Sequence, residues 1–281
     1  MAAVLKEVRV GRRGKAFPRW IQQPPSRREL AALSLTGAAV FFGLWQALAS
    51  SGLVSNFVLP SPSDVVVTIL LMVVEPFAGN TIQGHVVASL GRWAMGFGLA
   101  AGIGVPLGLA MGYWRLLDAM VSPLFEAYRY IAPLAWVPFA ALWFGTGIGG
   151  PVMVIFTGAF APCVLNAWRG AHLVERHLVE AARTLGAGGV RVMAEVLLPG
   201  ALPSVVSGLR VSAGLGWQSL IGAELIVVSS GIGYVLVQGQ SNLAPEIVMA
   251  AMLAVGVTGL LIDVALRFAE ARIRRRWGQT P

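Results

Sequence analysis

This sequence of 281 residues contains few charged residues. Only 12% of its residues are charged, whereas a soluble globular domain carries about 25%. A chain of this length with so few charges cannot cover a water-exposed surface. An intrinsically disordered chain is excluded for the opposite reason, because such chains are poor in apolar residues and here 56% are hydrophobic. The composition therefore predicts a membrane protein with several spans.

The sequence is also short of residues for thiol, metal and nucleotide chemistry. Its single cysteine, Cys163, lies in an apolar run, so neither an internal disulfide nor a cysteine metal cluster is possible. The three histidines are scattered, and we find no nucleophile elbow, metal triad or paired acid and base. Residues 11–16 look superficially like a phosphate-binding loop, but two residues separate the glycines instead of four and no Ser or Thr follows Lys15. We therefore expect a chain that is not an enzyme and binds no cofactor.

Long charge-free stretches, in contrast, are frequent. A transmembrane helix needs about 20 mostly apolar residues. The 39 uncharged residues from Tyr130 to Trp168 would measure about 58 Å as one helix, too long for one crossing, and Gly145–Pro151 supplies a turn. The sequence thus predicts an all-α protein with six transmembrane helices, at 30–51, 93–114, 118–144, 151–168, 203–228 and 246–268. A shorter apolar run, Val65–Val74, is expected to form a helix that lies at the outer interface or packs over the bundle.

Positive charge is absent from three segments between the predicted spans. Residues 52–84, 145–151 and 229–245 contain no Lys or Arg, although the chain has 21 such residues and a net charge of +8. Since Lys and Arg accumulate in cytoplasmic loops, we expect these segments outside and both termini in the cytoplasm. The basic charge is then explained without nucleic acid. Residues 1–28 are expected to form a basic cytoplasmic segment, and residues 29–281 the transmembrane domain.

The longest segment predicted to be cytoplasmic, 169–202, contains an amphipathic helix. The apolar residues on one face are Leu173, Leu178, Ala181, Ala182 and Leu185, while Glu175, Arg176, Glu180 and Arg183 are expected to lie in water. Gly186 is expected to end this helix. From the residues alone, two interpretations stay open: the helix lies on the membrane, or it docks into a groove on a partner.

A spaced motif runs through the same segment. Glu180, Ala181 and Ala182 are followed after three residues by Gly186, and after nine more by Val196, which precedes Leu198-Pro199 by one residue. This spacing resembles the EAA motif of binding-protein-dependent ABC importer permeases, in which isoleucine is usual where this chain has Val196. Further similarity to the nitrate, sulfonate and taurine branch covers residues 59–270, including Leu59–Pro62, Ser89–Arg92, Pro133–Pro138, Leu142–Gly145 and Gly216–Ser219.

The resemblance implies a type I importer permease-like fold and a set of partners. These are two copies of an ATPase subunit that binds ATP and Mg, a second permease copy in a homodimer, and an extracytoplasmic substrate-binding protein, all at a bacterial inner membrane. The residues implied in coupling to the ATPase are Leu178, Glu180, Ala181, Ala182, Leu185 and Gly186. The implied solute is a small anion such as taurine, another sulfonate or nitrate.

Charges inside spans are costly, so each one needs a reason. Glu126 and Arg129 can pair at i,i+3, and Asp263 can pair with Arg267 at i,i+4. Arg210 and Glu224 share a face of one span without touching, and Arg92 either extends toward the interface or makes the first contact with an anion. The residues expected to line a substrate path are Arg92, Glu126, Arg129, Trp136, Arg210, Trp217, Gln218, Ser219 and Glu224.

Two other classes of function are compatible with a polytopic chain. One is an ion-coupled secondary carrier that uses Glu126, Glu224 or Asp263 as a relay, and the other is a membrane-anchored assembly protein. The EAA-like motif favours the permease, because a secondary carrier has no partner cleft for such a helix.

Overall fold

The computed structural model describes residues 26–276, and the chain divides into two units, residues 1–54 and 55–281. The described part is helical, apart from one isolated bridge between Phe77 and Asn80. The prediction of an all-α fold is therefore confirmed for the described residues. Of the predicted basic segment 1–28, residues 1–25 lie outside the described residues.

The described part of the first unit is one apolar helix, α2 (Arg27–Ser50). Ser26 caps its start, since the Ser26 hydroxyl accepts from the N–H of Glu29 and the Glu29 carboxylate accepts from the N–H of Ser26 at 2.7 Å. Apolar side chains of α2 such as Leu35 and Phe41 are 72% and 62% exposed within the described structure. Such surface is compatible with a lipid environment and not with water.

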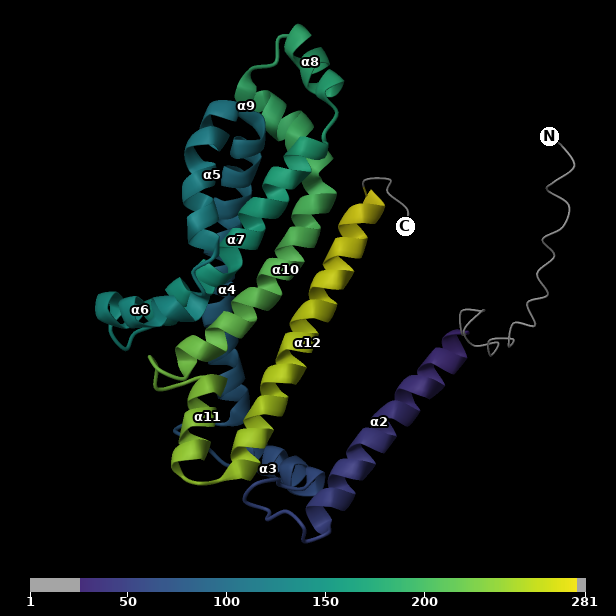
Figure 1. Cartoon of the computed structure of the whole chain (residues 1–281), viewed down its shortest axis with the longest axis vertical. Helices are drawn as coiled ribbons and strands as arrows, with labels where there is room; N and C mark the ends of the chain where they lie inside the picture. Colours follow the sequence, from purple (N-terminus) through teal and green to yellow (C-terminus); the bar gives the residue numbers. More distant parts are fainter. Residues whose placement is uncertain (1–25, 277–281) are drawn as a thin grey trace, which may run out of the picture. The chain divides into compact units, whose positions relative to one another are not determined.

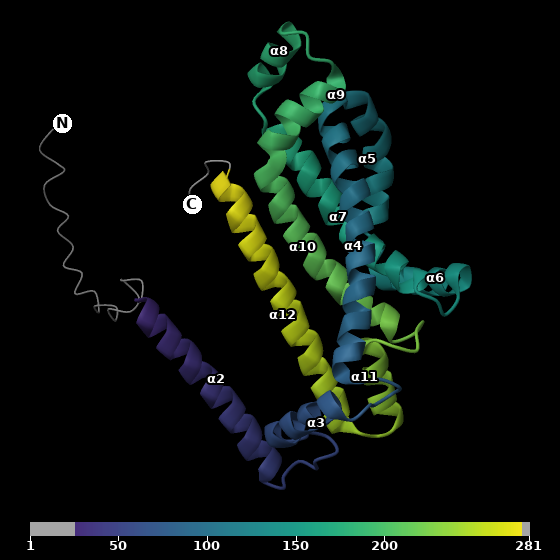
Figure 2. The ribbon, with the colours of Figure 1, turned by 180° about the vertical axis from the view of Figure 1, so that it is seen from behind.

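The second unit is a bundle with short helices at both ends (Figure 1). Its long helices are α4 (Ile82–Tyr113), α7 (Gly149–Leu173), α10 (Leu198–Glu224) and α12 (Pro245–Arg276). At one end lie α8 (Arg176–Thr184) and α9 (Gly189–Val192), and at the other lie α3 (Pro62–Val74) and α11 (Ile232–Ser241). Figure 2 shows the same arrangement from behind. A π-helical turn, η2 (Met193–Leu197), leads from α9 into α10.

Close contact between α4 and α7 forms the centre of this unit. Gly96, Ala100, Gly104 and Gly108 recur every four residues and are buried on one face of α4. A Cβ at Gly96 would lie 2.6 Å from the Cβ of Ile155 on α7, so only glycine permits this approach. Small residues at this spacing are the usual means of packing helices in a membrane, where backbone proximity and dispersion replace the hydrophobic effect.

Five helices within residues 26–276 are long and apolar enough to cross a membrane. They correspond to five of the six predicted spans, with longer bounds. One clear difference is at α4, which begins at Ile82 and not at residue 93. The polar residues before Trp93 continue the helix because their side chains are satisfied inside the unit, as described below.

The predicted span at 118–144 is not one continuous helix. The structure divides it into α5 (Arg115–Arg129), the 3-10 helix η1 (Pro133–Trp136) and α6 (Val137–Phe144). Proline disfavours helical backbone at the preceding residue and has no N–H to donate, so α5 ends before Pro133. The expectation of six helices of spanning length is thus confirmed for five.

Candidate functional site

The segment 169–202 folds as two short helices joined by a tight turn. At the end of α8, Gly186 has a φ of +87°. Its N–H donates to the carbonyl of Arg183 at 2.9 Å, and the N–H of Ala187 donates to the carbonyl of Ala182 at 3.0 Å. These two bonds form a Schellman cap, whose left-handed position favours glycine. The prediction that Gly186 ends the helix is confirmed.

Helix α8 has an attached face and an open face. Val179 is half-buried and packs against an apolar cluster formed by α4, α7, η2 and α10. Leu178 and Leu185, by contrast, are 48% and 88% exposed. Of the residues predicted to couple to an ATPase, the exposed ones are Leu178, Glu180, Ala181, Leu185 and Gly186, whereas Ala182 is half-buried. The open face therefore presents the apolar side chains of Leu178 and Leu185, which are seven positions apart, and nothing in the described unit covers them.

Arg183 is exposed, as the sequence predicts, but its guanidinium also has a partner within the unit. Its guanidinium donates to the hydroxyl of Tyr113 at 2.8 Å and lies 5.3 Å from the centroid of the Tyr113 ring. Tyr113 is the last residue of α4. The helix is therefore bonded to a part of the chain that sequence periodicity does not connect with it.

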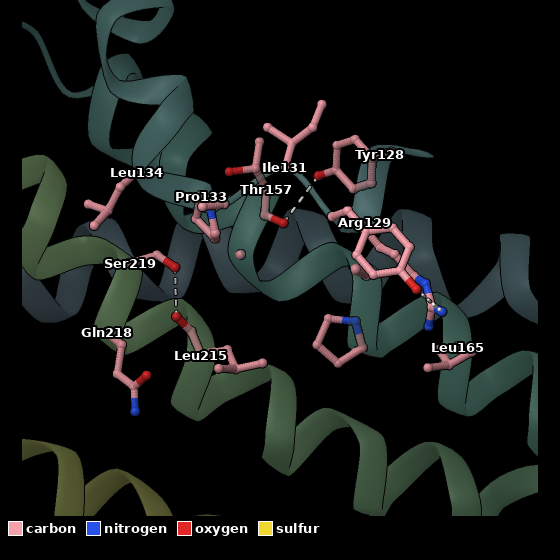
Figure 3. Close-up of a pocket in the computed structure, with 15 residues that line it drawn as sticks. Tyr128, Arg129, Ile131, Pro133, Leu134, Thr157, Leu165, Leu215, Gln218 and Ser219 are labelled. Atoms are coloured by element: carbon pink, nitrogen blue, oxygen red, sulfur yellow. Dashed lines mark hydrogen bonds between the residues drawn. The ribbon is translucent and has the colours of Figure 1, made fainter. Parts of the chain in front are cut away.

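A cavity of about 550 Å³ lies between the end of α5, η1, α7 and α10 (Figure 3). Three residues predicted to line a substrate path line this cavity, namely Arg129, Gln218 and Ser219. The prediction did not include its other polar residues, Tyr128, Tyr130 and Thr157, because nothing in the local sequence distinguishes them from residues at a membrane interface. The remaining wall is mainly apolar.

The charge at this cavity is nearly balanced. Among the residues that line it, Arg129 is the one that carries a charge. Its Nε lies 2.7 Å from Oε2 of Glu126, which confirms the predicted i,i+3 pair, and its Nη2 donates to the hydroxyl of Tyr130 at 3.2 Å. The Arg129 side chain is 31% exposed, so it can still approach a solute.

A second cavity, of about 540 Å³, lies between α10 and α12. Gln218 lines both cavities, and Arg210 lines this one. Nε of Arg210 donates to Asp263 at 2.7 Å, and its Nη1 lies 3.6 Å from Glu270. Asp263 also pairs with Arg267 at 2.8 Å, as predicted. The sequence therefore identified Arg210 as an in-facing charge, but its carboxylate partners come from α12.

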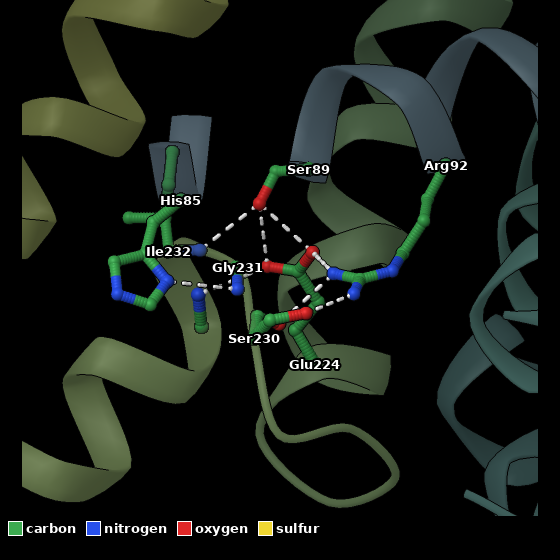
Figure 4. Close-up of polar contacts among 8 residues, drawn as sticks. His85, Ser89, Arg92, Glu224, Ser230, Gly231 and Ile232 are labelled. Atoms are coloured by element: carbon green, nitrogen blue, oxygen red, sulfur yellow. Dashed lines mark hydrogen bonds and ion pairs between the residues drawn. The ribbon is translucent and has the colours of Figure 1, made fainter. Parts of the chain in front are cut away.

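Arg92 and Glu224 form a buried ion pair at the other end of the unit (Figure 4). The exposed fractions of the two residues are 8% and 0%. Nη1 of Arg92 donates to Oε1 of Glu224 at 2.7 Å and to the carbonyl of Ser230 at 2.9 Å, while its Nη2 bonds the Ser230 hydroxyl. Glu224 also accepts from the hydroxyl of Ser89 at 2.8 Å and from the N–H of Gly233 at 3.0 Å.

This cluster ties α4 to the turn between α10 and α11. Nδ1 of His85 accepts from the N–H of Gly231 at 3.1 Å, and its Nε2 lies 3.0 Å from the carbonyl of Phe77. The guanidinium of Arg92 is therefore occupied by internal partners, does not extend to the interface and lines neither of the two cavities described above, and the carboxylate of Glu224 is likewise occupied and lines neither. A signal was present in the sequence, because His85, Ser89 and Arg92 are spaced by four and three residues and so share one helix face.

The two tryptophans predicted to line a path lie elsewhere. Trp217 is 5% exposed and donates from Nε1 to the carbonyl of Val255 at 3.2 Å, so its ring packs between α10 and α12. The ring of Trp136 lies 6.2 Å from that of Tyr128. Within the described residues its buried Nε1 has no hydrogen-bond partner. Neither tryptophan lines the two cavities.

Residues 104–277 match the family described as binding-protein-dependent transport system inner membrane component. The chain is 33% identical over 256 residues to the taurine transport system permease protein TauC of Escherichia coli, with 91% of each chain covered. It is 34% identical over 276 residues to the bicarbonate transport system permease protein CmpB of Synechococcus elongatus, covering 95% of this chain and 96% of that one.

Two further similarities agree with this family. The putative aliphatic sulfonates transport permease protein SsuC of Bacillus subtilis is 32% identical over 254 residues, covering 90% of this chain and 91% of that one. An inward-facing structure of the MetNI methionine ABC transporter shares the fold, with a TM-score of 0.58, 20% identity and coverage of 68% of this chain and 93% of that chain. The chain therefore belongs to the binding-protein-dependent inner membrane components: it is the non-catalytic permease subunit of an ABC importer, and a separate subunit binds ATP.

Proposed function

We propose that this permease passes a small oxyanion from an extracytoplasmic binding protein into the cytoplasm by alternating access. The observation that carries the proposal is the identity of its relatives. Their names specify taurine, aliphatic sulfonates and bicarbonate, which share a compact anionic group with several oxygens. Nitrate has the same character.

The cavity at Arg129 is suited to such a solute, although it does not form a tight binding site. It offers one guanidinium, an amide from Gln218 and the hydroxyl of Tyr130, which can donate to an oxyanion, whereas the Ser219 hydroxyl donates to the carbonyl of Leu215 at 2.8 Å. Because Glu126 offsets the charge of Arg129, an anion would be held weakly. Weak binding suits a path, since selection belongs to the binding protein and the solute has to leave again.

Coupling to ATP hydrolysis is proposed for α8. A helix with exposed Leu178 and Leu185 on one face fits the helix-in-groove mode of recognition, in which apolar side chains enter a partner's cleft. Glu180 lies on another face of the helix from these leucines, and its exposed carboxylate can pair with a group beside that cleft and so fix the orientation. We propose two ATPase subunits, one on the α8 of each permease copy.

The second permease copy is proposed to be another copy of this chain. Side chains of α6, next to the cavity wall in η1, are strongly exposed, including Leu142 at 80% and Trp143 at 64%. A second copy that covers this surface would also enclose the cavity between the two chains. Both termini are proposed to lie in the cytoplasm, on the side of α8.

The coupling proposal is tested with Glu180→Lys in the reconstituted complex. Reversing this exposed charge is expected to lower copurification of the ATPase, or solute-dependent ATP hydrolysis, about tenfold, while membrane insertion continues. Arg191→Gln is the control, since Arg191 is exposed on α9 and pairs locally with Glu195 at 3.0 Å. Unchanged assembly and hydrolysis in Glu180→Lys would refute docking through α8.

The solute proposal is tested separately, by uptake into proteoliposomes that contain the complex and its binding protein. We expect ATP-dependent accumulation of a labelled sulfonate, taurine, nitrate or bicarbonate. Arg129→Gln is expected to lower the rate several-fold. If the binding protein delivers only a neutral or cationic solute, the anion assignment is wrong, although the permease assignment stands.

A further inference from the structure

Helix α8 is attached to the rest of its unit by few contacts. Short non-helical links, residues 174–175 and 185–188, join it to α7 and α9. Among the side chains of the helix, Val179 packs against the apolar cluster of the unit and Arg183 bonds to Tyr113. These positions are four apart and therefore share one face, which differs from the open face that carries Leu178 and Leu185. One face holds the helix while the other is available to a partner.

The Tyr113 end of the Arg183 contact is fixed before any partner binds. The Tyr113 ring packs against the apolar cluster that includes Leu109 of α4 and Leu197 of η2. The first residue of α9 lies close to it, since a Cβ at Gly189 would be 3.5 Å from the ring. The hydroxyl therefore presents a preorganised acceptor to the guanidinium, and the ring face adds a cation–π contact.

Helix α4 leads from this contact to the opposite end of the unit. Its 32 residues correspond to about 48 Å of helix. Near its start, Ser89 and Arg92 hold the turn between α10 and α11 through Glu224. One long helix is thus bonded at one end to α8 and at the other end to the cluster around Glu224.

We infer that Arg183 and Tyr113 form a positioning contact that holds the docking helix α8 on α4, so that a displacement of α8 by the ATPase moves α4. This inference rests on the proposed docking of α8. The contact acts through the helix and touches neither ATP nor solute. Its loss leaves the docking face intact and removes the directional contact with α4, whereas Val179 still packs against the apolar cluster.

The test measures movement of α4 in the assembled complex by electron paramagnetic resonance. Spin labels are placed at Gly102→Cys on α4, which faces open space, and at Leu261→Cys on α12, which is 62% exposed. Native Cys163 is 2% exposed and does not compete. In the otherwise unaltered complex, MgATP with vanadate is expected to shift the distance between the labels.

The variants then separate a positioning contact from a general defect. Tyr113→Leu and Arg183→Gln are each expected to reduce the population with the shifted distance about fivefold. Their combination should be no worse than either alone, because both remove the same contact. Tyr113→Phe, which keeps the ring, should give a smaller loss, and Arg191→Gln should match the unaltered complex. Additive losses, no loss, or no shift in the unaltered complex would overturn the inference.

Leu185→Asp distinguishes failure of this inference from failure of the proposed function. If it abolishes copurification of the ATPase while the Tyr113 and Arg183 variants shift normally, docking stands and only the positioning contact is refuted. If Leu185→Asp assembles normally, docking through α8 is itself refuted.

Discussion

At the scale of single residues, the buried ion pair of Arg92 and Glu224 is expected to contribute strongly to the stability of the fold. A charge in a low-dielectric interior is tolerated only when it is paired and hydrogen-bonded, and here both side chains have several partners. Removing one member leaves the other charge buried without compensation. Removing both leaves an apolar gap and neutral groups, which costs less.

We therefore predict that Arg92→Leu or Glu224→Leu destabilises the protein by about 3–5 kcal/mol, and that the double variant recovers part of this loss. Thermal unfolding of the purified protein in detergent measures the effect. Arg191→Leu breaks an ion pair whose side chains are 69% and 61% exposed, and it should cost less than about 1 kcal/mol. If the single and double variants lost the same amount of stability, the unpaired buried charge would not be the cause of the destabilisation.

The same cluster shows a limit of sequence analysis at this scale. Local ion pairs such as Glu126–Arg129 and Asp263–Arg267 could be predicted, because helical spacing alone brings their side chains together. The partner of Arg92 lies 132 positions away, and the spacing of a helix carries no information about it. The polar face of α4 could be anticipated, but not its partner.

At the scale of elements, the contact of α4 with α7 depends on the absence of side chains at defined positions. We predict that Gly104→Leu destabilises the protein by about 1–3 kcal/mol, since even a Cβ there would lie 2.9 Å from the Cβ of Cys163. Gly102→Leu adds the same atoms on the same helix but faces open space. Thermal unfolding should separate the two variants, and similar midpoints would contradict close packing at Gly104.

The end of α8 provides a second test at this scale. Gly186 adopts a left-handed conformation with nothing within 4 Å of an added Cβ, so a substitution there acts through the backbone. Gly186→Val should cost about 1–2 kcal/mol of local strain and lower copurification of the ATPase several-fold, whereas Gly186→Asn should be nearly neutral. Equal effects of Val and Asn would indicate that side-chain volume, and not φ, is what matters.

The sequence predicts the end of a helix correctly where one strong local signal marks it. Gly186 marked a helix end correctly because a Schellman cap is local. The sequence does not reveal the break within 118–144, because the uncharged run from Tyr130 continues through it and hydropathy outweighs Pro133 and Pro138. The cavity beside this break was only partly foreseen for the same reason, since it lies where α5 stops.

At the scale of the whole molecule, family membership decides between the classes of function that composition left open. An ion-coupled secondary carrier and an assembly protein are excluded, because the chain is the permease component of a binding-protein-dependent importer. The carboxylates that such a carrier would need are engaged with arginines in the structure.

The orientation of the whole chain in the membrane is also predicted. All segments assigned to the outside lack Lys and Arg. A cysteine at Asn80, which is exposed before α4, should react with a membrane-impermeant maleimide added to the outer face, and one at Arg272, near the end of α12, should not. Labelling in intact spheroplasts and after permeabilisation provides the comparison. The reverse pattern would overturn the orientation and the proposed direction of transport.

Site-specific photo-crosslinking, in membranes that contain the whole complex, tests most directly whether α8 docks this permease onto its ATPase. A photoreactive amino acid at Leu185, which is 88% exposed, is compared with one at Asn80, at the other end of the unit. We predict an adduct with the ATPase subunit from position 185 and none from position 80. An ATPase adduct from position 80, or none from position 185 in an assembled complex, would contradict it.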